Sequence, residues 1–172
     1  MSRFKIKIIY YSAGSVRKSV PIKRYIDKGF TSNYQVSIGV NVYVKEVEYT
    51  TEDNATLSFW DIGEQEKFKF IRNSLLKGAF GAVLEFDLSQ ISTFDEVKTI
   101  LDEARKITSK KVPFILIGNA DLGRSIDREE IHSYVVEEGG IYVESSDKTE
   151  ENLNKALTEL TREIIDTFVL SN

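Results

Sequence analysis

The sequence predicts an α/β protein in which a mainly parallel sheet is covered by helices on both faces. Two observations carry this prediction. Segments whose apolar residues alternate at every second position are interspersed with segments whose apolar residues recur at three- and four-residue steps. One pair of strand segments flanks a short polar turn, whereas the later strand segments are separated by helix-length stretches. Because no linker-like stretch interrupts the pattern, residues 1–172 are expected to form one domain with a sizeable core.

The predicted strands differ in their packing. The first alternates apolar residues with Lys5 and Lys7. The second and third flank the polar cluster at residues 50–54 and are expected to form an antiparallel hairpin. The next two are short and apolar, which is typical of strands buried on both faces. In chain order, the strands are predicted over residues 4–10, 40–44, 55–59, 83–87, 112–118 and 141–144.

Helices are predicted between these strands. Asp127 and Glu130 have the spacing of a capping box before one apolar stripe. Asp147 and Glu150 have the same spacing before the longest stripe, so Asp147 is expected to cap the last helix. The helical patterns cover residues 18–28, 94–107, 131–135 and 153–168.

The composition excludes several classes of function. The chain is 41% hydrophobic and carries a formal charge of -4, so nucleic acid is not an expected partner. It contains no cysteine, which excludes thiolate catalysis, cysteine-ligated metals and prenyl or palmitoyl anchors. With His132 as its single histidine, a Ser-His-Asp triad or a multi-histidine metal site is not expected either. No segment has the length and hydrophobicity of a transmembrane helix or a secretory signal, so a soluble cytoplasmic protein is expected.

Ligands of such sheets bind at the carboxyl ends of the strands. The first loop there, residues 12–19, follows a strand and opens a helix, which is the context of a phosphate-binding loop. Lys18 supplies an ammonium group for phosphates, and Ser19 supplies a hydroxyl for magnesium. The match to the pattern GxxxxGK[ST] is incomplete because Ser12 and Arg17 occupy both glycine positions.

Four more segments lie beside the same predicted edge. Together with the first loop, their order and spacing resemble the Ras superfamily of small GTPases, most nearly its Rab/Ras branch. The resemblance covers nearly the whole chain, from about Lys5 to Ile165. The segments are Tyr34-Gln35-Val36-Ser37-Ile38-Gly39-Val40, Phe59-Trp60-Asp61-Ile62-Gly63-Glu64-Gln65-Glu66, Ile117-Gly118-Asn119-Ala120-Asp121-Leu122 and Val143-Glu144-Ser145-Ser146-Asp147-Lys148.

This resemblance implies a P-loop GTPase fold, with a six-stranded sheet, one antiparallel strand pair and five helices. It also implies a guanine nucleotide, GTP or GDP, bound with Mg²⁺ at the sheet edge. Gln65 would orient the attacking water as the catalytic residue. Ser19, Ser37 and Asp61 would hold the metal, Asp61 through water, while Asn119 and Asp121 would read guanine. The nucleotide-binding residues implied are Gly14, Ser15, Val16, Arg17, Lys18, Ser19, Phe30, Ser37, Asn119, Asp121, Ser146 and Lys148.

The sequence departs from the family pattern around the phosphates. A phosphate-binding loop turns its backbone N–H groups inward, and Arg17 replaces a glycine that leaves this space open. Glu64 replaces the glycine of the DxxG motif and places a carboxylate where the terminal phosphate is expected. Two like charges about 4 Å apart cost at most about 4 kcal/mol at an effective dielectric constant of roughly 20.

Two further departures affect the base and the sheet. Asn119 and Asp121 are two residues apart, whereas the NKxD motif separates them by three, and Asp147 replaces the alanine of the SAK motif. Glu85 lies in a strand that is expected to be buried on both faces, where a carboxylate needs a partner. Either Arg17 or Lys18 pairs with it, or it faces a wet part of the phosphate pocket.

Two functions follow from these observations. One is a pseudo-GTPase, a regulatory protein-interaction module with weakened or lost nucleotide binding, which needs no cofactor. The other is a working GTPase switch that retains GTP, GDP and Mg²⁺ and hydrolyses GTP. A phospho-acceptor receiver domain is set aside, because the first strand ends Tyr10-Tyr11-Ser12 without paired acids. Protein partners are expected to bind a switch-like surface formed by Ile38, Val40, Tyr43, Trp60, Phe68, Phe70 and Ile71.

Overall fold

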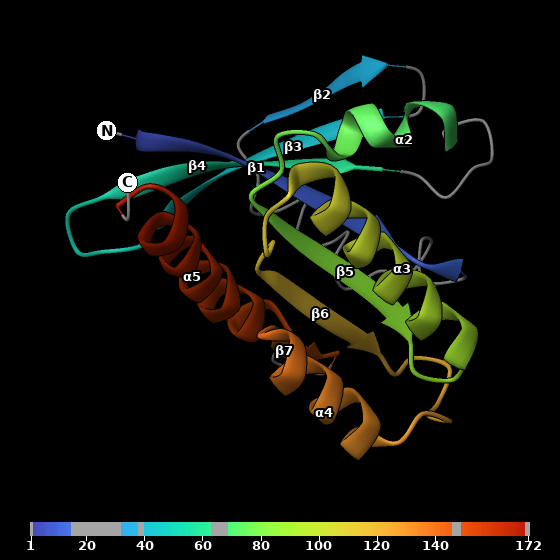
Figure 1. The fold of residues 1–172 in the computed structure, drawn as a ribbon. Helices are drawn as coiled ribbons and strands as arrows, with labels where there is room; N and C mark the ends of the chain where they lie inside the picture. Colours follow the sequence, from blue (N-terminus) through green and yellow to red (C-terminus); the bar gives the residue numbers. More distant parts are fainter. Residues whose placement is uncertain (1, 15–31, 38–39, 63–68, 146–148, 171–172) are drawn as a thin grey trace.

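A computed structural model of the protein (Figure 1) describes residues 2–14, 32–37, 40–62, 69–145 and 149–170. Within this part of the chain, a single twisted sheet carries helices on both faces. The α/β class predicted from the sequence is confirmed.

The sheet contains seven strands in the order β2-β3-β4-β1-β5-β6-β7. Strands β4, β1, β5, β6 and β7 are parallel, whereas β3 is antiparallel to both β2 and β4. Their bounds are β1 Ser2–Ser12, β2 Ser32–Ser37, β3 Val40–Glu48, β4 Asn54–Asp61, β5 Gly81–Asp87, β6 Phe114–Asn119 and β7 Ile141–Glu144.

The six strands predicted from the sequence are all present, and β3 and β4 form the predicted hairpin. The additional strand is β2, which pairs with β3 at one edge of the sheet. The predicted pattern placed this segment in a connecting loop, because its six residues carry no long apolar alternation.

The described helices are α2 Lys69–Leu76, α3 Ile91–Thr108, α4 Arg128–Glu138 and α5 Thr149–Phe168. The last three correspond to predicted apolar stripes. Asp127 caps α4 as predicted, because its side chain accepts a hydrogen bond from the backbone N–H of Glu129 at 3.0 Å. The helix predicted over residues 18–28 and the proposed cap Asp147 lie outside the described residues.

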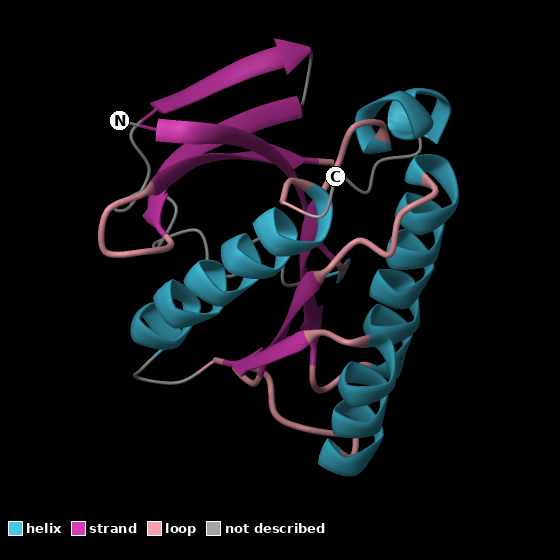
Figure 2. Ribbon diagram, turned by 60° about the vertical axis from the view of Figure 1, so that its left-hand side comes forward, coloured by secondary structure: helices cyan, strands magenta, loops and turns pink. Residues whose placement is uncertain are grey.

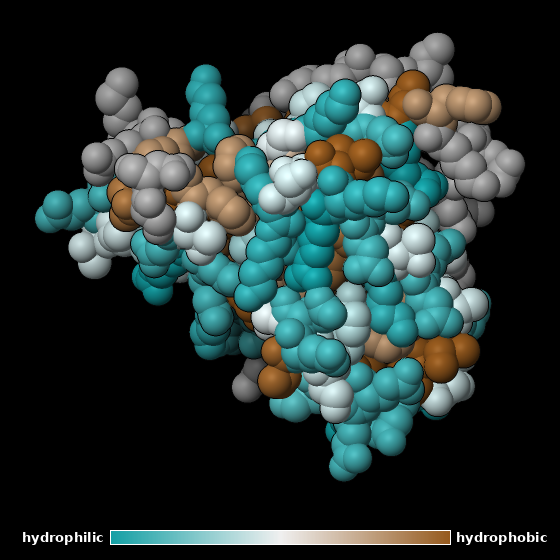
Figure 3. Space-filling model, in the orientation of Figure 1, coloured by the Kyte–Doolittle hydropathy of each residue, from teal (hydrophilic) through white to brown (hydrophobic). Residues whose placement is uncertain are grey.

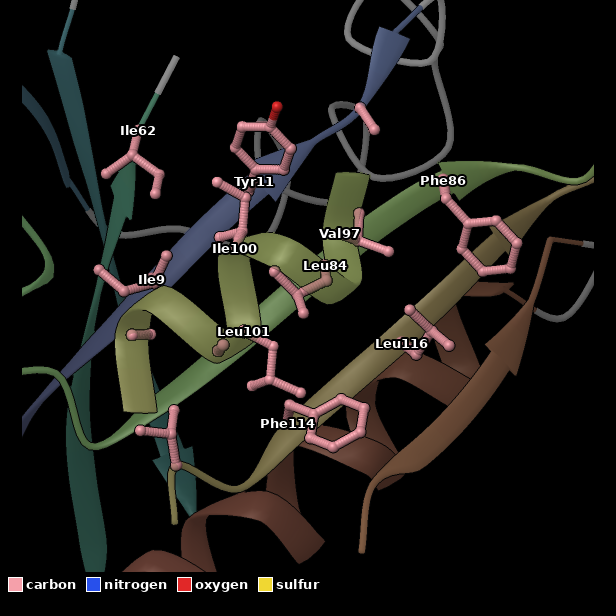
Figure 4. Packing of buried hydrophobic residues seen from close by; sticks show 14 of the residues in the cluster. Ile9, Tyr11, Ile62, Leu84, Phe86, Val97, Ile100, Leu101, Phe114 and Leu116 are labelled. Atoms are coloured by element: carbon pink, nitrogen blue, oxygen red, sulfur yellow. The ribbon is translucent and has the colours of Figure 1, made fainter. Parts of the chain in front are cut away.

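Side chains from the sheet's two faces form two hydrophobic cores. On one face, β1, β5 and β6 pack against α2, α3 and α4; on the other, the same strands with β4 pack against α5. Figure 2 shows these layers, and Figure 4 shows Ile9, Leu84 and Phe114 of the sheet beside Ile100 and Leu101 of α3. Alternation along each strand therefore divides its apolar side chains between the two cores.

The view of the surface in Figure 3 is largely hydrophilic, with hydrophobic atoms gathered in small separate patches. None of the described helices has both the length and the apolar character that crossing a bilayer requires.

Candidate functional site

Five parallel strands end at one edge of the sheet and bring polar residues together there. The last residues of these strands are Ser12, Asp61, Asp87, Asn119 and Glu144. Cross-strand register places Tyr10 beside Asp61 and Asp87 beside Asn119. The carboxyl edge predicted to hold the ligand is thus rich in hydrogen-bonding groups.

The chain leaves β1 through a glycine that the local backbone requires. The N–H of Ala13 donates to the carbonyl of Glu85 at 2.9 Å, which holds the start of the loop against β5. Gly14 has a φ of 56°, and a Cβ atom on it would lie 2.9 Å from Cγ2 of Thr93 in α3. Glycine is therefore favoured at position 14 for two reasons: the backbone is left-handed there, and a Cβ atom would be too close to Thr93. The phosphate-loop residues that follow, Ser15 to Ser19, lie outside the described residues.

Glu85 is the most unusual group at this edge. It is 1% exposed, lies between β1 and β6, and accepts hydrogen bonds from Ser12 Oγ at 3.2 Å and Asn119 Nδ2 at 3.3 Å. Ser12 Oγ also lies 3.0 Å from the hydroxyl of Tyr10. No ion pair within the described part of the chain involves Glu85.

The charge state of Glu85 reflects this environment. Burial raises the pKa of Glu85 from 4.5 to about 7, and the nearby carboxylate of Asp121 acts in the same direction. Hydrogen bonds from Asn119, Ser12 and Tyr10 lower the pKa and offset part of this rise. Burial, followed by the charge of Glu85, also raises the pKa of Tyr10 well above its ordinary value.

The structure corrects part of the sequence interpretation of Glu85. Because the Glu85 side chain is almost fully buried, it does not face water in a phosphate pocket, which was one of the two alternatives. Its neutral partners Ser12 and Asn119 were not foreseen, because no local pattern links residues 73 and 34 positions away in the chain. The other alternative, an ion pair with Arg17 or Lys18, involves residues outside the description and stays a prediction.

The loop after β6 carries the residues that the resemblance assigns to base reading. Asn119 is 1% exposed; its Nδ2 donates to Glu85, and its Oδ1 accepts from the backbone N–H of Asp121 at 2.9 Å. The next backbone N–H, of Ala120, donates to Ser145 Oγ at 2.9 Å. Asp121 is exposed. Asn119 is thus turned toward the sheet, whereas Asp121 is exposed, and the assignment of both residues to guanine reading stays a prediction.

A turn that the sequence analysis left without a role lies beside Asn119. Asp87 is buried, and its carboxylate accepts hydrogen bonds from the backbone N–H and the hydroxyl of Ser89 at 2.8 and 2.6 Å. Thr93 Oγ1 accepts from the N–H of Asp87 at 2.9 Å. In the sequence, the only sign of this turn was an acid, Asp87, at the end of a predicted strand. Its hydrogen bonds hold the turn that leads from β5 into α3.

A second group of charges lies at the end of β7. Glu144 forms ion pairs with Arg124 and Arg128 and accepts a hydrogen bond from the hydroxyl of Tyr142 at 3.1 Å. The same hydroxyl occupies the space that a Cβ atom on Gly118 would need. These contacts tie the loop before α4 to β7, and the sequence offered no signal for them beyond Glu144 at a strand end.

The predicted magnesium ligands are only partly described. Asp61 is half-buried at the end of β4, as expected. Ser37 ends β2, but its side chain, like Ser19 as a whole, is outside the description. Across the described ranges, no three His, Asp or Glu side chains are grouped so as to hold a metal ion. The other predicted site residues that lie outside the description are Phe30, Gln65, Ser146 and Lys148, and Glu64, the residue in place of the DxxG glycine, lies outside it as well.

Of the residues predicted to form the partner surface, some are exposed or half-buried in the structure and one is buried. Phe70 and Ile71 of α2 are 93% and 37% exposed, and Trp60 and Tyr43 are half-buried. Val40 is fully buried, because as the first residue of β3 it packs into the core beside α2 and α3, so it cannot be a surface contact. Ile38 and Phe68 lie outside the described residues.

Comparison with known proteins agrees with this architecture. The sequence model of the Ras family matches residues 7–166. A relative from Zea mays, the GTP-binding protein YPTM1, is 29% identical over 164 residues, which cover 94% of this chain and 78% of the relative. Together with the P-loop GTPase-like sheet and helices, these matches show that the chain belongs to the Ras family of small GTPases.

Proposed function

We propose that this protein is a pseudo-GTPase: a regulatory protein-interaction module with a Ras family fold and weakened or lost guanine-nucleotide binding. The observation that carries the proposal is the buried contact between Glu85 and Asn119, 3.3 Å from Oε1 to Nδ2. It joins a carboxyl group at the carboxyl edge to the side chain that the family uses to recognise guanine.

The contact weakens base recognition in two ways. It holds a donor of Asn119 within the sheet, while the short spacing to Asp121 uses the Asn119 carbonyl for a local turn. A base would have to compete with both hydrogen bonds, and breaking the first would leave a buried carboxyl group without that donor. The exposed carboxylate of Asp121 then lacks the neighbouring amide with which it would read guanine.

The sequence departures at the phosphates point the same way. Arg17 and Glu64 stand where the family has glycines, so side chains occupy positions that serve phosphate binding through the backbone. Weaker contacts to the base and weaker contacts to the phosphates both lower the affinity for a guanine nucleotide. By contrast, the described residues form a buried apolar core on each face of the sheet.

An interaction role is supported by the surface of α2. Phe70 is 93% exposed, although a large aromatic side chain gains most from burial, and Ile71 lies next to it. Trp60 of β4 is half-buried, and the ammonium group of Lys7 lies 4.0 Å from its ring centre. We assign these residues to the surface on which a protein partner docks.

A working GTPase switch is the second candidate, and one observation favours it. Asp61 lies at the end of β4 on the carboxyl edge, where the family holds magnesium through water. The sequence also retains Lys18, Ser19 and Gln65 for the phosphates, the metal and the attacking water.

Nucleotide content separates the two candidates. The protein is purified without added nucleotide and denatured, and the released nucleotide is quantified by chromatography. A pseudo-GTPase releases far less than one equivalent, and titration with a fluorescent GDP analogue at pH 8 gives weak binding with little preference over the ADP analogue. A near-stoichiometric amount of GDP or GTP, or tight and guanine-selective binding at pH 8, contradicts the proposal and favours the switch.

The interaction surface is tested separately. Photo-crosslinkers placed at position 71 of the otherwise unchanged chain and of the Phe70→Ser variant are compared in cell extract by mass spectrometry. Products that require Phe70 are expected. Because the side chain of Phe70 is almost fully exposed, this variant should keep the thermal stability of the parent. Identical crosslinked products from the two chains would contradict the assigned surface.

A further inference from the structure

Glu85 belongs to a chain of hydroxyl groups that can accommodate two charge states. The Tyr10 hydroxyl and Ser12 Oγ lie 3.0 Å apart, and Ser12 Oγ and Glu85 Oε2 lie 3.2 Å apart. When Glu85 is ionised, Tyr10 donates to Ser12 and Ser12 donates to the carboxylate. When Glu85 is protonated, the directions reverse, so that Glu85 donates to Ser12 and Ser12 donates to Tyr10. In both charge states, therefore, Ser12 can form hydrogen bonds with both Tyr10 and Glu85.

The charges around this group favour its neutral form. Facing Glu85 are Tyr10 and Ser12 from β1, Asn119 from β6 and Asp121 from the following loop. Among these, the charged group is the Asp121 carboxylate, which repels an ionised Glu85. Asp61 of β4 acts on Tyr10 and adds another negative charge to the same edge. Burial raises the pKa of Glu85 to about 7, so both charge states are accessible near neutral pH.

The position of Glu85 joins it to both halves of the expected ligand site. Its carbonyl accepts from the N–H of Ala13, immediately before the loop that the resemblance assigns to phosphate binding. Its carboxyl group accepts from Asn119, at the start of the base-reading loop. An anion bound at this edge would raise the cost of an ionised Glu85, and by reciprocity a protonated Glu85 would bind an anion more tightly.

We propose that Glu85 makes anion binding at the carboxyl edge proton-linked, so that a nucleoside diphosphate or triphosphate binds together with one proton taken up by the Glu85 carboxyl group. The inference rests on the proposed function, in which nucleotide affinity is weak at and above neutral pH. The proton comes from solvent and adds to Oε2, the oxygen that faces Ser12, and no other covalent bond forms or breaks. In this proposal Glu85 acts on the bound anion through its charge.

The test measures affinity for a fluorescent GDP analogue at pH 6 and pH 8 in the parent chain, in Glu85→Gln and in Glu163→Gln. Glu163 is a matched control, because it is a partly buried glutamate of α5 whose pKa is also raised by burial. Its charged neighbours are Lys111, just before β6, and Glu159 of the same helix. If binding requires the protonated form, the apparent Kd of the parent rises about tenfold from pH 6 to pH 8. Glu163→Gln should retain this rise, and Glu85→Gln should lose most of it.

A direct readout covers the case in which Glu85→Gln does not fold. Carbon-13 NMR of the glutamate carboxyl groups in the parent chain follows the titration of Glu85, and its midpoint should move to higher pH when GDP is added. The same pH dependence in the parent and Glu85→Gln, a midpoint unmoved by GDP, or no GDP binding at any pH from 6 to 8 would overturn the inference. Tight binding at pH 8 would instead contradict the proposed function, so the two failures are distinguishable.

Discussion

At the scale of single residues, Glu85 links the chemistry of the edge to the stability of the fold. Its native pKa of about 7 lies above the ordinary 4.5. The native state therefore holds the proton more tightly than the unfolded chain does. The stability that this gives is fully present below about pH 4.5 and is lost as the pH rises through 7. A pKa difference of this size corresponds to about 3 kcal/mol as an upper value.

Glu85→Gln should therefore change stability in a pH-dependent way. The amide keeps the size of the side chain and cannot ionise, so the variant should be more stable than the parent at pH 8, by up to about 3 kcal/mol. At pH 5 the two chains should differ much less, because Glu85 is then largely protonated. Urea unfolding at both pH values measures the free energies, with Glu163→Gln as the control. An equal difference at pH 5 and pH 8 would show that ionisation of Glu85 does not affect the fold.

Gly14 allows a second prediction at this scale, because Gly78 provides a matched control. Both have a positive φ, of 56° and 76°, but only Gly14 has a neighbour, Thr93 Cγ2, in the path of a new Cβ atom. Gly78→Ala should cost about 1 kcal/mol of unfolding free energy from the backbone alone. Gly14→Ala should cost more, and the excess should shrink in a Thr93→Ser background, which removes Cγ2 and keeps the hydroxyl. Equal losses at the two glycines would contradict the steric argument.

At the scale of elements, the sequence predicted those helices and strands whose pattern lies within the segment itself, and it missed those that depend on contacts with other segments. The alternation in β1 and the stripes of α3 and α5 predict these elements because burial of one face repeats along the segment itself. The edge strand β2 has only two apolar residues, Tyr34 and Val36, and gains its hydrogen bonds from β3. The helix α2 has only eight residues, so burial of one face repeats over barely two turns.

The same distinction applies to the site. The strand ends Asp61 and Asn119 could be assigned to the carboxyl edge from chain order alone. Glu85 was recognisable as a misplaced charge, but its bonds to Ser12 and Asn119 depend on the register of three strands. The burial of Val40 depends likewise on which face of β3 meets the core, and its alternation fits either face.

The cap of α4 gives a prediction for one element. Asp127 accepts from the N–H of Glu129, and Gly139 ends the helix in a left-handed conformation. Asp127→Ala removes the acceptor and should lower the unfolding free energy by about 1 kcal/mol. Asp127→Asn keeps an acceptor oxygen and should retain most of the stability that the cap contributes. Thermal or urea unfolding measures both variants. If the asparagine variant loses as much as the alanine variant, the charge of Asp127 matters and the cap does not.

At the scale of the whole molecule, the division into two hydrophobic cores and a ligand edge determines how the protein responds to nucleotide. Apolar side chains from α2, α3 and α4 cover one face of the sheet, and those from α5 cover the other. These contacts leave the carboxyl edge to polar groups such as Asp87, Asn119 and Glu144, each of which forms a hydrogen bond with a neighbouring residue. The fold is therefore expected to be stable without a ligand, and saturating binding at 100 times the Kd would add about 2.7 kcal/mol.

This separation predicts that nucleotide binding can be restored by changes at the edge alone. Arg17→Gly reopens the backbone around the phosphates, Glu64→Gly removes the acid expected beside the terminal phosphate, and a lysine inserted between Asn119 and Ala120 restores the family spacing. The insertion also breaks the two-residue turn in which Asn119 Oδ1 accepts from the N–H of Asp121, which frees that oxygen.

The triple variant should bind GDP far more tightly than the parent and prefer it to ADP, because Asp121 regains its partner amide. Its thermal midpoint should rise by several degrees with micromolar GDP and Mg²⁺, whereas that of the parent should change little. The single changes should add where the loops do not touch, but if Arg17 and Glu64 pair, changing one alone leaves an unpaired charge and lowers stability. Fluorescence titration and thermal unfolding of all variants measure both effects. If the parent binds GDP as tightly as the triple variant, Arg17, Glu64 and the short base-reading loop do not impair the site, and the protein is a functioning nucleotide switch.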